Sequence, residues 1–105
     1  MFYIHYMNHC CYILYSKKLN RYYIGYSSDL DIRLVFHEKS EPRKFTYNAS
    51  DWKLYYKIDC KSKSQGESIE GHIKRMKSRI YIENLIKYPE ITTKLLEKYK
   101  DINII

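Results

Sequence analysis

Two groups of charged side chains have the spacing that places them on one face of a helix. Arg33 and His37 are four residues apart. Glu70 is followed, four and seven residues later, by Lys74 and Lys77. An arginine carries a planar, permanently charged fork that suits phosphate, and a histidine titrates near neutral pH. The simpler explanations are solvated helix charges, a surface histidine, and an ordinary helical pair between Glu70 and Lys74.

The net charge of the chain is +7 at pH 7, with a pI near 9.3. A basic surface attracts phosphate backbones through Coulomb attraction and counterion release, so nucleic acid is the leading class of partner. A lysine-rich soluble surface is the alternative that charge alone leaves open. The 13 tyrosines fit both explanations, because aromatic rings stack on bases but also fill protein cores.

Length, cysteine content and hydropathy argue against several other classes. A chain of 105 residues suits one core, so we expect a single domain spanning 1–105. The three cysteines lack the spacing of a zinc site. The longest uncharged apolar run, Cys10–Tyr15, is far shorter than the roughly 20 residues of a membrane helix, and the N-terminus lacks the features of a secretory signal. We therefore expect a cytoplasmic protein without a membrane span.

Hydrophobic patterning and turn residues predict three strands and four helices. The expected strands are 12–15, 22–26 and 52–58, and the last two helices are expected at 79–87 and 91–99. Capping signatures at Ser28–Asp31 and Ser64–Glu67 predict where the first two helices begin. The polar stretch 38–51, broken by Pro42, predicts a loop. This order indicates an α+β fold, an antiparallel sheet with helices packed on it.

Several short motifs follow one another along the chain. They are Cys10-Cys11-Tyr12, Tyr23-Ile24-Gly25, Arg33 ten residues after Tyr23, His37, and Glu70 on a predicted helix. In this order and spacing the chain resembles the GIY-YIG nucleases, over roughly 10–86. It is most similar to their small stand-alone bacterial subgroup, and also to the N-terminal nuclease domain of excinucleases and to Slx-type structure-specific endonucleases. Residues 87–105 are expected to form a C-terminal helical extension.

The resemblance implies a fold and a reaction. The fold is a three-stranded antiparallel sheet flanked by helices, and the reaction is phosphodiester hydrolysis with one divalent ion, Mg²⁺ or Mn²⁺. Glu70 would hold that ion, and Arg33 would bind the scissile phosphate. Such groups suit the reaction, because attack by water puts extra negative charge on the phosphoryl and leaving oxygens. A hard cation on one carboxylate, still carrying several waters, suits nucleic-acid cleavage.

The resemblance also places two strand tyrosines in the active site. Tyr12 would receive the proton of the nucleophile or orient the water, and Tyr23 would hydrogen-bond in the same pocket. A phenol has a reference pKa of about 10, so it is a weak base at neutral pH unless a cation lowers that value. Tyr12, His37 and a metal-bound water therefore all stay candidates for the base. The alternative for each tyrosine is packing in the core.

Four further residues are expected to bind substrate. Tyr26 stands where some relatives carry a lysine and would contact phosphate through its hydroxyl. Gly25 would let the backbone turn tightly or approach the substrate closely, although a bulge would also explain it. Lys74 and Lys77 follow Glu70 on the same helix and would contact phosphates.

The leading hypothesis is a divalent-metal-dependent endonuclease that acts on DNA. Branched, flapped or single-stranded DNA of repair or recombination would be its substrate. The first alternative is a catalytically weak or inactive nucleic-acid-binding module of the same fold. The second is a small interaction protein that binds another protein through the helices of 79–99. The sequence leaves open whether the chain works with a protein partner or as a homodimer.

Overall fold

The sheet has its first strand in the centre. The computed structural model describes residues 8–38 and 49–101. Strands β1 (Cys10–Ser16), β2 (Arg21–Ser27) and β3 (Lys53–Asp59) pair antiparallel in the order β2-β1-β3. β1 is almost wholly buried, because it is paired on both edges and covered on both faces. Its register with β2 sets Tyr12 opposite Gly25 and Leu14 opposite Tyr23.

The turn between β1 and β2 is held by an aspartate that precedes β3. The Ser16 hydroxyl donates to Asp51 at 2.7 Å, and the backbone N–H of Lys18 donates to the same carboxylate at 2.8 Å. Ser16 in turn accepts from the backbone N–H of Leu19 at 3.1 Å. Asn20 closes the turn with φ 53°, a left-handed conformation that asparagine tolerates better than most residues. The start of β2 is thereby fixed against the rest of the sheet.

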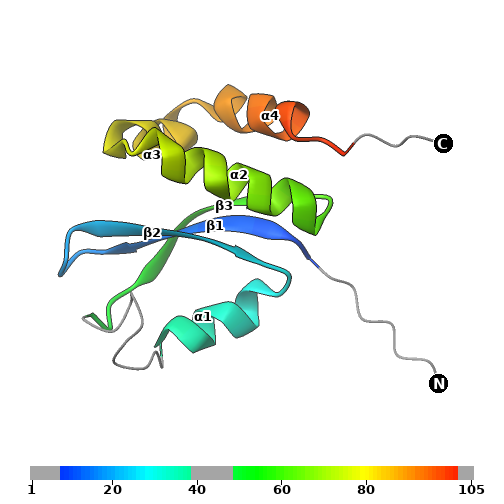
Figure 1. Ribbon diagram of the computed structural model, residues 1–105. Helices are drawn as coiled ribbons and strands as arrows, with labels where there is room; N and C mark the ends of the chain where they lie inside the picture. The colour runs from blue at the N-terminus through cyan, green and yellow to red at the C-terminus, as the bar shows by residue number, and fades with distance from the viewer. Residues whose placement is uncertain (1–7, 39–48, 102–105) are drawn as a thin grey trace, which may run out of the picture.

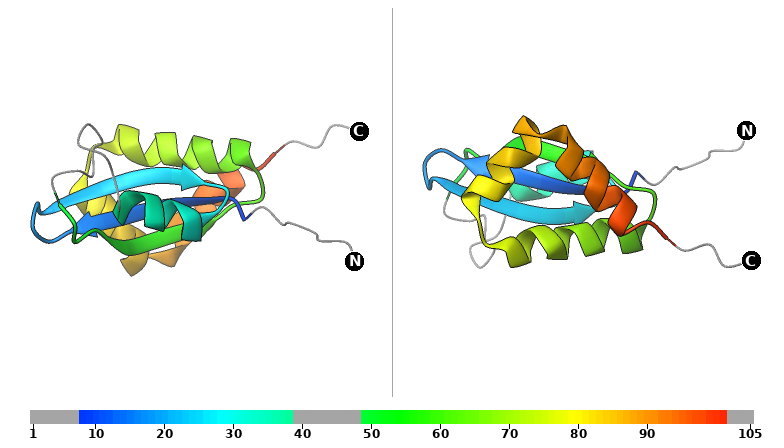
Figure 2. Two further views of the ribbon diagram at one scale, coloured as in Figure 1. Left: turned by 90° about the horizontal axis from the view of Figure 1, so that it is seen from below. Right: turned by 90° about the horizontal axis from the view of Figure 1, so that it is seen from above.

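Four helices cover the sheet unequally. α1 (Leu30–Glu38) lies on one face, whereas α2 (Lys63–Met76), α3 (Arg79–Lys87) and α4 (Pro89–Lys98) lie on the other (Figure 1). Figure 2 shows from two sides that α2 runs alongside β2, at the edge of the sheet opposite β3. Within 8–38 and 49–101, no helix has both the length and the apolar character needed to cross a membrane.

The two faces of the sheet contribute to separate hydrophobic clusters. The larger cluster joins the sheet to α2, α3 and α4, and its buried members are Cys11, Ile13, Ile58, Ile69, Ile73, Ile82, Leu85 and Leu95. The smaller one lies under α1 and consists of Cys10, Tyr12 and Leu14, with Tyr23, Leu30, Leu34 and Trp52 packed against them. Alternation along β1 sends successive side chains to opposite clusters, as expected for a strand covered on both faces.

The structure confirms the α+β prediction and corrects two helix starts. α3 begins and ends where the sequence predicted. α2 is capped by Ser62 rather than Ser64, since the Ser62 hydroxyl accepts from the N–H of Gln65 at 3.1 Å. α1 is capped by Asp29 rather than Ser28, because the Asp29 carboxylate accepts from the N–H of Ile32 at 3.3 Å. Most of the predicted loop 38–51 lies outside the described residues.

Candidate active site

Tyr12 and Tyr23 lie on the face of the sheet that α1 covers. Both belong to the smaller cluster, and their ring centroids are 6.3 Å apart with planes inclined by 34°. Tyr12 comes from the central strand and is 1% exposed, whereas Tyr23 comes from β2 and is half-buried. The sheet register therefore brings the two predicted tyrosines together, with the second one closer to the solvent-facing edge.

The ring of Tyr12 occupies the space in which a side chain at Gly25 would sit. A Cβ built on Gly25 would lie 2.5 Å from the Tyr12 hydroxyl oxygen and 2.6 Å from its Cζ atom. Gly25 does not have a positive φ, and the irregularity in the sheet falls between Ile13 and Leu14, in the pairing of β1 with β3. The glycine is thus required for clearance. It lets the Tyr12 hydroxyl extend across β2.

Three of the predicted site residues influence the pKa of the Tyr12 hydroxyl. Burial is the main cause that raises its pKa above the ordinary phenol value; Tyr23 and Glu70 raise it further, and Arg33 lowers it. Residues from β2, α1 and α2 therefore all influence this one phenol. A raised pKa favours the neutral phenol form of Tyr12.

Glu70 extends from α2, which runs beside β2. Its side chain is 21% exposed, and its carboxylate pairs with the ammonium of Lys74 at 3.1 Å. This is the ordinary i, i+4 pair that the sequence also allowed, and such pairs stabilise a helix only weakly. The helix continues through Gly71 without a break from Lys63 to Met76. Glu70 is therefore held in place by its helix and by Lys74.

Arg33 and His37 both belong to α1. The helix starts firmly, because Arg33 donates its backbone N–H to the carbonyl of Asp29 at 3.1 Å while the Asp29 side chain caps Ile32. The Arg33 side chain is exposed and acts on Tyr12 from the α1 side. His37 lies one turn further along the same helix, and its side chain is outside the described residues.

A family model supports the interpretation of this arrangement. The model of the GIY-YIG catalytic domain matches residues 8–84. The chain belongs to the GIY-YIG family. That span contains β1, β2, α1, β3 and α2, and with them every predicted site residue. GIY-YIG domains form a family of nucleases, which act on nucleic acid.

Among solved structures, the solution NMR structure of a UPF0213 protein from Bacillus halodurans is similar to this GIY-YIG domain. The two chains are 30% identical, and the match covers 83% of this chain and 94% of the other, with a TM-score of 0.49. The curated proteins contain no match.

The side chains around Glu70 suit a divalent ion that is held mainly by substrate. Across 8–38 and 49–101, no three histidine, cysteine, aspartate or glutamate side chains gather closely enough to form a metal cage. Mg²⁺ commonly binds one or two carboxylates together with water and substrate phosphate. The lone carboxylate of Glu70 fits that kind of site in this GIY-YIG domain, and Lys74 would have to release it.

A hollow opens at the edge of β2, next to this group. It measures about 290 Å³ and is lined by Tyr22, Tyr23, Ile24 and Lys74. Tyr23 reaches it from the α1 side of the sheet, and Lys74 reaches it from α2. The hollow is therefore the place where a phosphate could meet groups from both sides of the GIY-YIG sheet.

Tyr26 is placed differently from the other predicted residues. It points to the α2 side of the sheet, where a Cβ on Gly66 would lie 2.7 Å from its ring. Its hydroxyl is hydrogen-bonded to the Nδ1 atom of His9 at 2.5 Å, and the two rings are stacked. Tyr26 thus seats the start of α2 on β2, and any phosphate would share its hydroxyl with His9.

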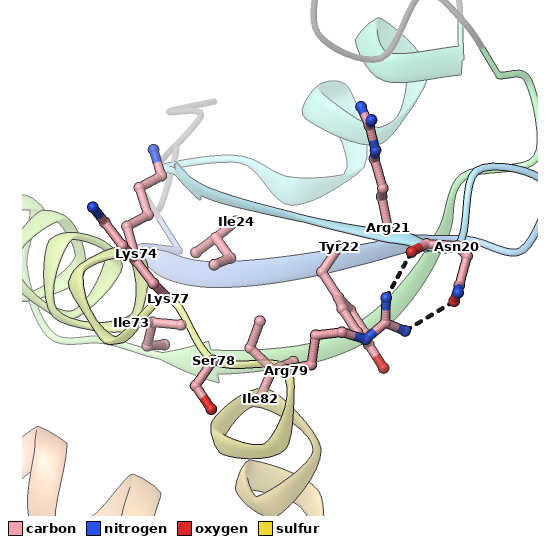
Figure 3. A pocket seen from close by; sticks show the side chains of 10 residues that line it. All are labelled: Asn20, Arg21, Tyr22, Ile24, Ile73, Lys74, Lys77, Ser78, Arg79 and Ile82. Atoms are coloured by element: carbon pink, nitrogen blue, oxygen red, sulfur yellow. Dashed lines mark hydrogen bonds between the residues drawn. The ribbon is translucent and has the colours of Figure 1, made fainter.

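The sequence did not indicate a place near the site for two further basic residues, Arg21 and Arg79. Arg21 is two residues before Tyr23, so strand alternation places it on the same face; Figure 3 shows it pointing toward the side on which α1 lies. Arg79 donates to the Asn20 backbone carbonyl at 2.7 Å and to its side-chain oxygen at 2.9 Å (Figure 3). The period of two could have revealed Arg21, whereas no local signal links Arg79 to a turn 59 residues earlier.

Proposed function

We propose that this GIY-YIG domain is a divalent-metal-dependent endonuclease that hydrolyses phosphodiester bonds in DNA at the outer edge of β2. The observation that carries the proposal is that Tyr23, Arg33 and Glu70 all act electrostatically on the Tyr12 hydroxyl, and that the rings of Tyr12 and Tyr23 lie 6.3 Å apart. Three different elements supply these groups, and each group is of the type that the reaction needs. Residues 10–86 would hold the catalytic core, 87–105 would be the helical extension of the same domain, and Mg²⁺ or Mn²⁺ would be the ion.

Each side chain has a separate task in the proposed reaction. Arg33 binds the scissile phosphate through charge-assisted hydrogen bonds that strengthen as negative charge develops. Tyr23, at the mouth of the hollow, hydrogen-bonds a phosphoryl oxygen. Glu70 would hold the divalent ion, which would supply positive charge to offset the negative charge of the phosphate. Water adds to phosphorus, one P–O ester bond breaks, and the leaving oxygen takes a proton.

Tyr12 would act as a neutral phenol that orients the attacking water. Burial keeps its pKa above the ordinary value, so the phenolate form is scarce at neutral pH. Of the side chains proposed as the base, this leaves His37, which lies one turn after Arg33 and carries an imidazole, a group that titrates near neutral pH. A pH–rate profile of His37→Gln tests this assignment: loss of an acidic limb near pH 6–7 supports it.

Cleavage of DNA by wild type and by Glu70→Ala tests the proposed function. Supercoiled plasmid and labelled branched or single-stranded DNA are incubated with Mg²⁺ or Mn²⁺, and with a chelator. Wild type should cut only with the ion present. Glu70→Ala should lose at least about 100-fold in rate, because the ion then has no protein ligand.

Glu97→Gln is a matched control for the loss of a helical glutamate. Glu97 on α4 is paired with Lys100 at 2.6 Å, as Glu70 is with Lys74. The control should cut DNA at the wild-type rate. DNA binding without cleavage by any of the proteins would instead support the alternative of an inactive binding module.

A further inference from the structure

A second hollow continues from the candidate active site along β2. It measures about 270 Å³ and lies between the start of β2 and the junction of α2 with α3 (Figure 3). It shares Tyr22, Ile24 and Lys74 with the first hollow. The two together form one groove that leads from the catalytic groups toward the β1–β2 turn.

The groove combines an apolar floor with a rim of positively charged side chains. Ile73 and Ile82 are 1% and 6% exposed, so they form its deeper part, whereas Lys77 and Arg79 are exposed at its border. None of the ten residues that line the second hollow is acidic. The carboxylate of Glu83 meets the hydroxyl of Tyr22 at 3.4 Å but is not part of the lining.

Two of the basic residues are held in defined positions. Arg79 is fixed by its two hydrogen bonds to Asn20, and its guanidinium lies 5.2 Å from the centre of the Tyr22 ring. Lys77 ends α2 in a left-handed conformation with φ 47°, and its N–H donates to the carbonyl of Lys74. The charge of Arg79 is therefore placed before any ligand arrives, which lowers the ordering cost of binding, and the cap conformation sets where the Lys77 side chain leaves the backbone.

We propose that this second hollow binds one unpaired nucleotide of the DNA strand next to the scissile phosphate. Its sugar and base lie against the partly exposed side chains of Tyr22 and Ile24, and its phosphate is bound by Lys77 and Arg79. A paired duplex would need only the cations, whereas an aromatic side chain in a basic groove, here Tyr22, is the pattern by which proteins bind single strands. The inference rests on the proposed function in that it takes DNA as the substrate. It narrows that substrate to DNA with a single-stranded segment at the cut.

Binding of two matched DNAs in the absence of divalent ions tests the inference. One DNA is a blunt duplex hairpin, and the other has the same length with an unpaired overhang, prepared in 5′ and 3′ versions. Fluorescence anisotropy is measured in a chelator, so cleavage does not interfere. Wild type should bind one overhang about tenfold more tightly than the blunt duplex.

The variant Lys77→Asn removes the charge and keeps the left-handed backbone, which asparagine tolerates. It should bind the overhang roughly three- to tenfold more weakly. The slope of the logarithm of the binding constant against the logarithm of the salt concentration should become shallower by about 0.7, the value for one phosphate contact of a single strand. Lys94→Gln removes an exposed lysine of α4 that lines neither hollow, and should change neither quantity. Thermal melts of both variants check that they are folded.

The outcomes separate this inference from the proposed function. Equal affinity of wild type for overhang and blunt duplex, or equal losses in Lys77→Asn and Lys94→Gln, would overturn the groove assignment. If wild type also cuts DNA in that case, the endonuclease proposal stands by itself. A Lys77-dependent overhang preference in a protein that never cuts DNA supports the groove and overturns the endonuclease proposal instead.

Discussion

The two faces of the sheet are covered very differently. On one face, three helices bury eight residues in a single apolar cluster. On the other, and counting only residues 8–38 and 49–101, the nine-residue helix α1 covers three buried residues, one of which is Tyr12, while Ile32 and Val35 are exposed at 68% and 51%. On this side the two tyrosines of the candidate site pack among leucines, and Arg33 is exposed on the covering helix.

Because of this difference, the residues that provide most of the folding free energy and the groups proposed for catalysis lie in different parts of the molecule. Burial of aliphatic side chains is the main source of folding free energy, so the face with three helices holds the fold together. Among the described residues the α1 face contributes less burial, but it carries Tyr12 and Tyr23, and the helix that holds Glu70, α2, runs beside β2 (Figure 2). The groups proposed for catalysis thus meet at the border between the two faces.

Truncation of a core residue on each face should measure the contrast directly. Leu85→Ala removes a fully buried side chain from the larger cluster and should lower the free energy of unfolding by about 2–5 kcal/mol. Leu34→Ala removes a half-buried side chain that α1 packs against the smaller cluster, and should cost about 1–2 kcal/mol because less apolar surface is lost. Urea denaturation gives both values, and equal losses would contradict the comparison.

The substitution Gly25→Ala should affect activity more than stability. The added methyl group would overlap the Tyr12 ring, so the ring must move, at a cost of about 1–3 kcal/mol in unfolding free energy. We expect the rate of DNA cleavage to fall by roughly 100-fold, since a small misplacement of a positioned group is sufficient for that loss. The cleavage assay and a thermal melt test this together. Full activity in a folded Gly25→Ala protein would show that Tyr12 is not needed where it lies.

Gly71→Ala is the matched glycine substitution on α2. A Cβ there would meet only the end of the flexible Arg75 side chain, at 3.0 Å, and the residue lies inside a continuous helix. The variant should therefore gain about 0.5–1 kcal/mol in unfolding free energy, the usual difference between alanine and glycine in a helix. Cleavage should stay within about twofold of wild type, because the backbone at Glu70 is unchanged. Destabilisation would mean that Arg75 cannot move aside.

The smallest expected effect is a pH dependence of stability that arises where the end of α4 packs against α2. The Nδ1 atom of His72 is hydrogen-bonded to the Tyr99 hydroxyl at 2.8 Å; burial lowers the pKa of His72, and the charges of Lys98 and Arg75 lower it further. The unfolded chain therefore binds a proton more readily, so stability should decrease as pH falls below about 6.5. Melting temperatures between pH 7.5 and 5.5 should fall more for wild type than for His72→Gln. Parallel curves would contradict this assignment.

Local sequence patterns were sufficient for the fold. The three strands, the helix at 79–87 and the order of elements follow from hydrophobic periodicity and turn residues, which act over a few neighbouring positions. The helix caps were harder to predict, because Ser62 and Ser64 are both plausible acceptors two residues apart. Only the backbone geometry shows which hydroxyl meets the N–H of Gln65.

The candidate site was predicted less completely, because its contacts join distant parts of the chain. The motif order indicated Tyr12, Tyr23, Arg33 and Glu70, and the structure brings these four into one neighbourhood. Nothing local to Tyr26 indicates that His9 takes its hydroxyl, which depends on how the chain enters β1. The same holds for the Asn20 contacts of Arg79, which depend on how α3 packs beside the turn.

The fit between the Tyr12 ring and Gly25 also constrains how such a sequence can evolve. A descendant that replaced the glycine first would displace the tyrosine, and one that shortened the tyrosine first would leave a void above the strand. Neither single step is neutral, so the two positions, 13 residues apart, should be inherited together or altered as a pair. In an alignment of descendants, a small aliphatic residue at position 12 should accompany sequences in which position 25 is no longer glycine.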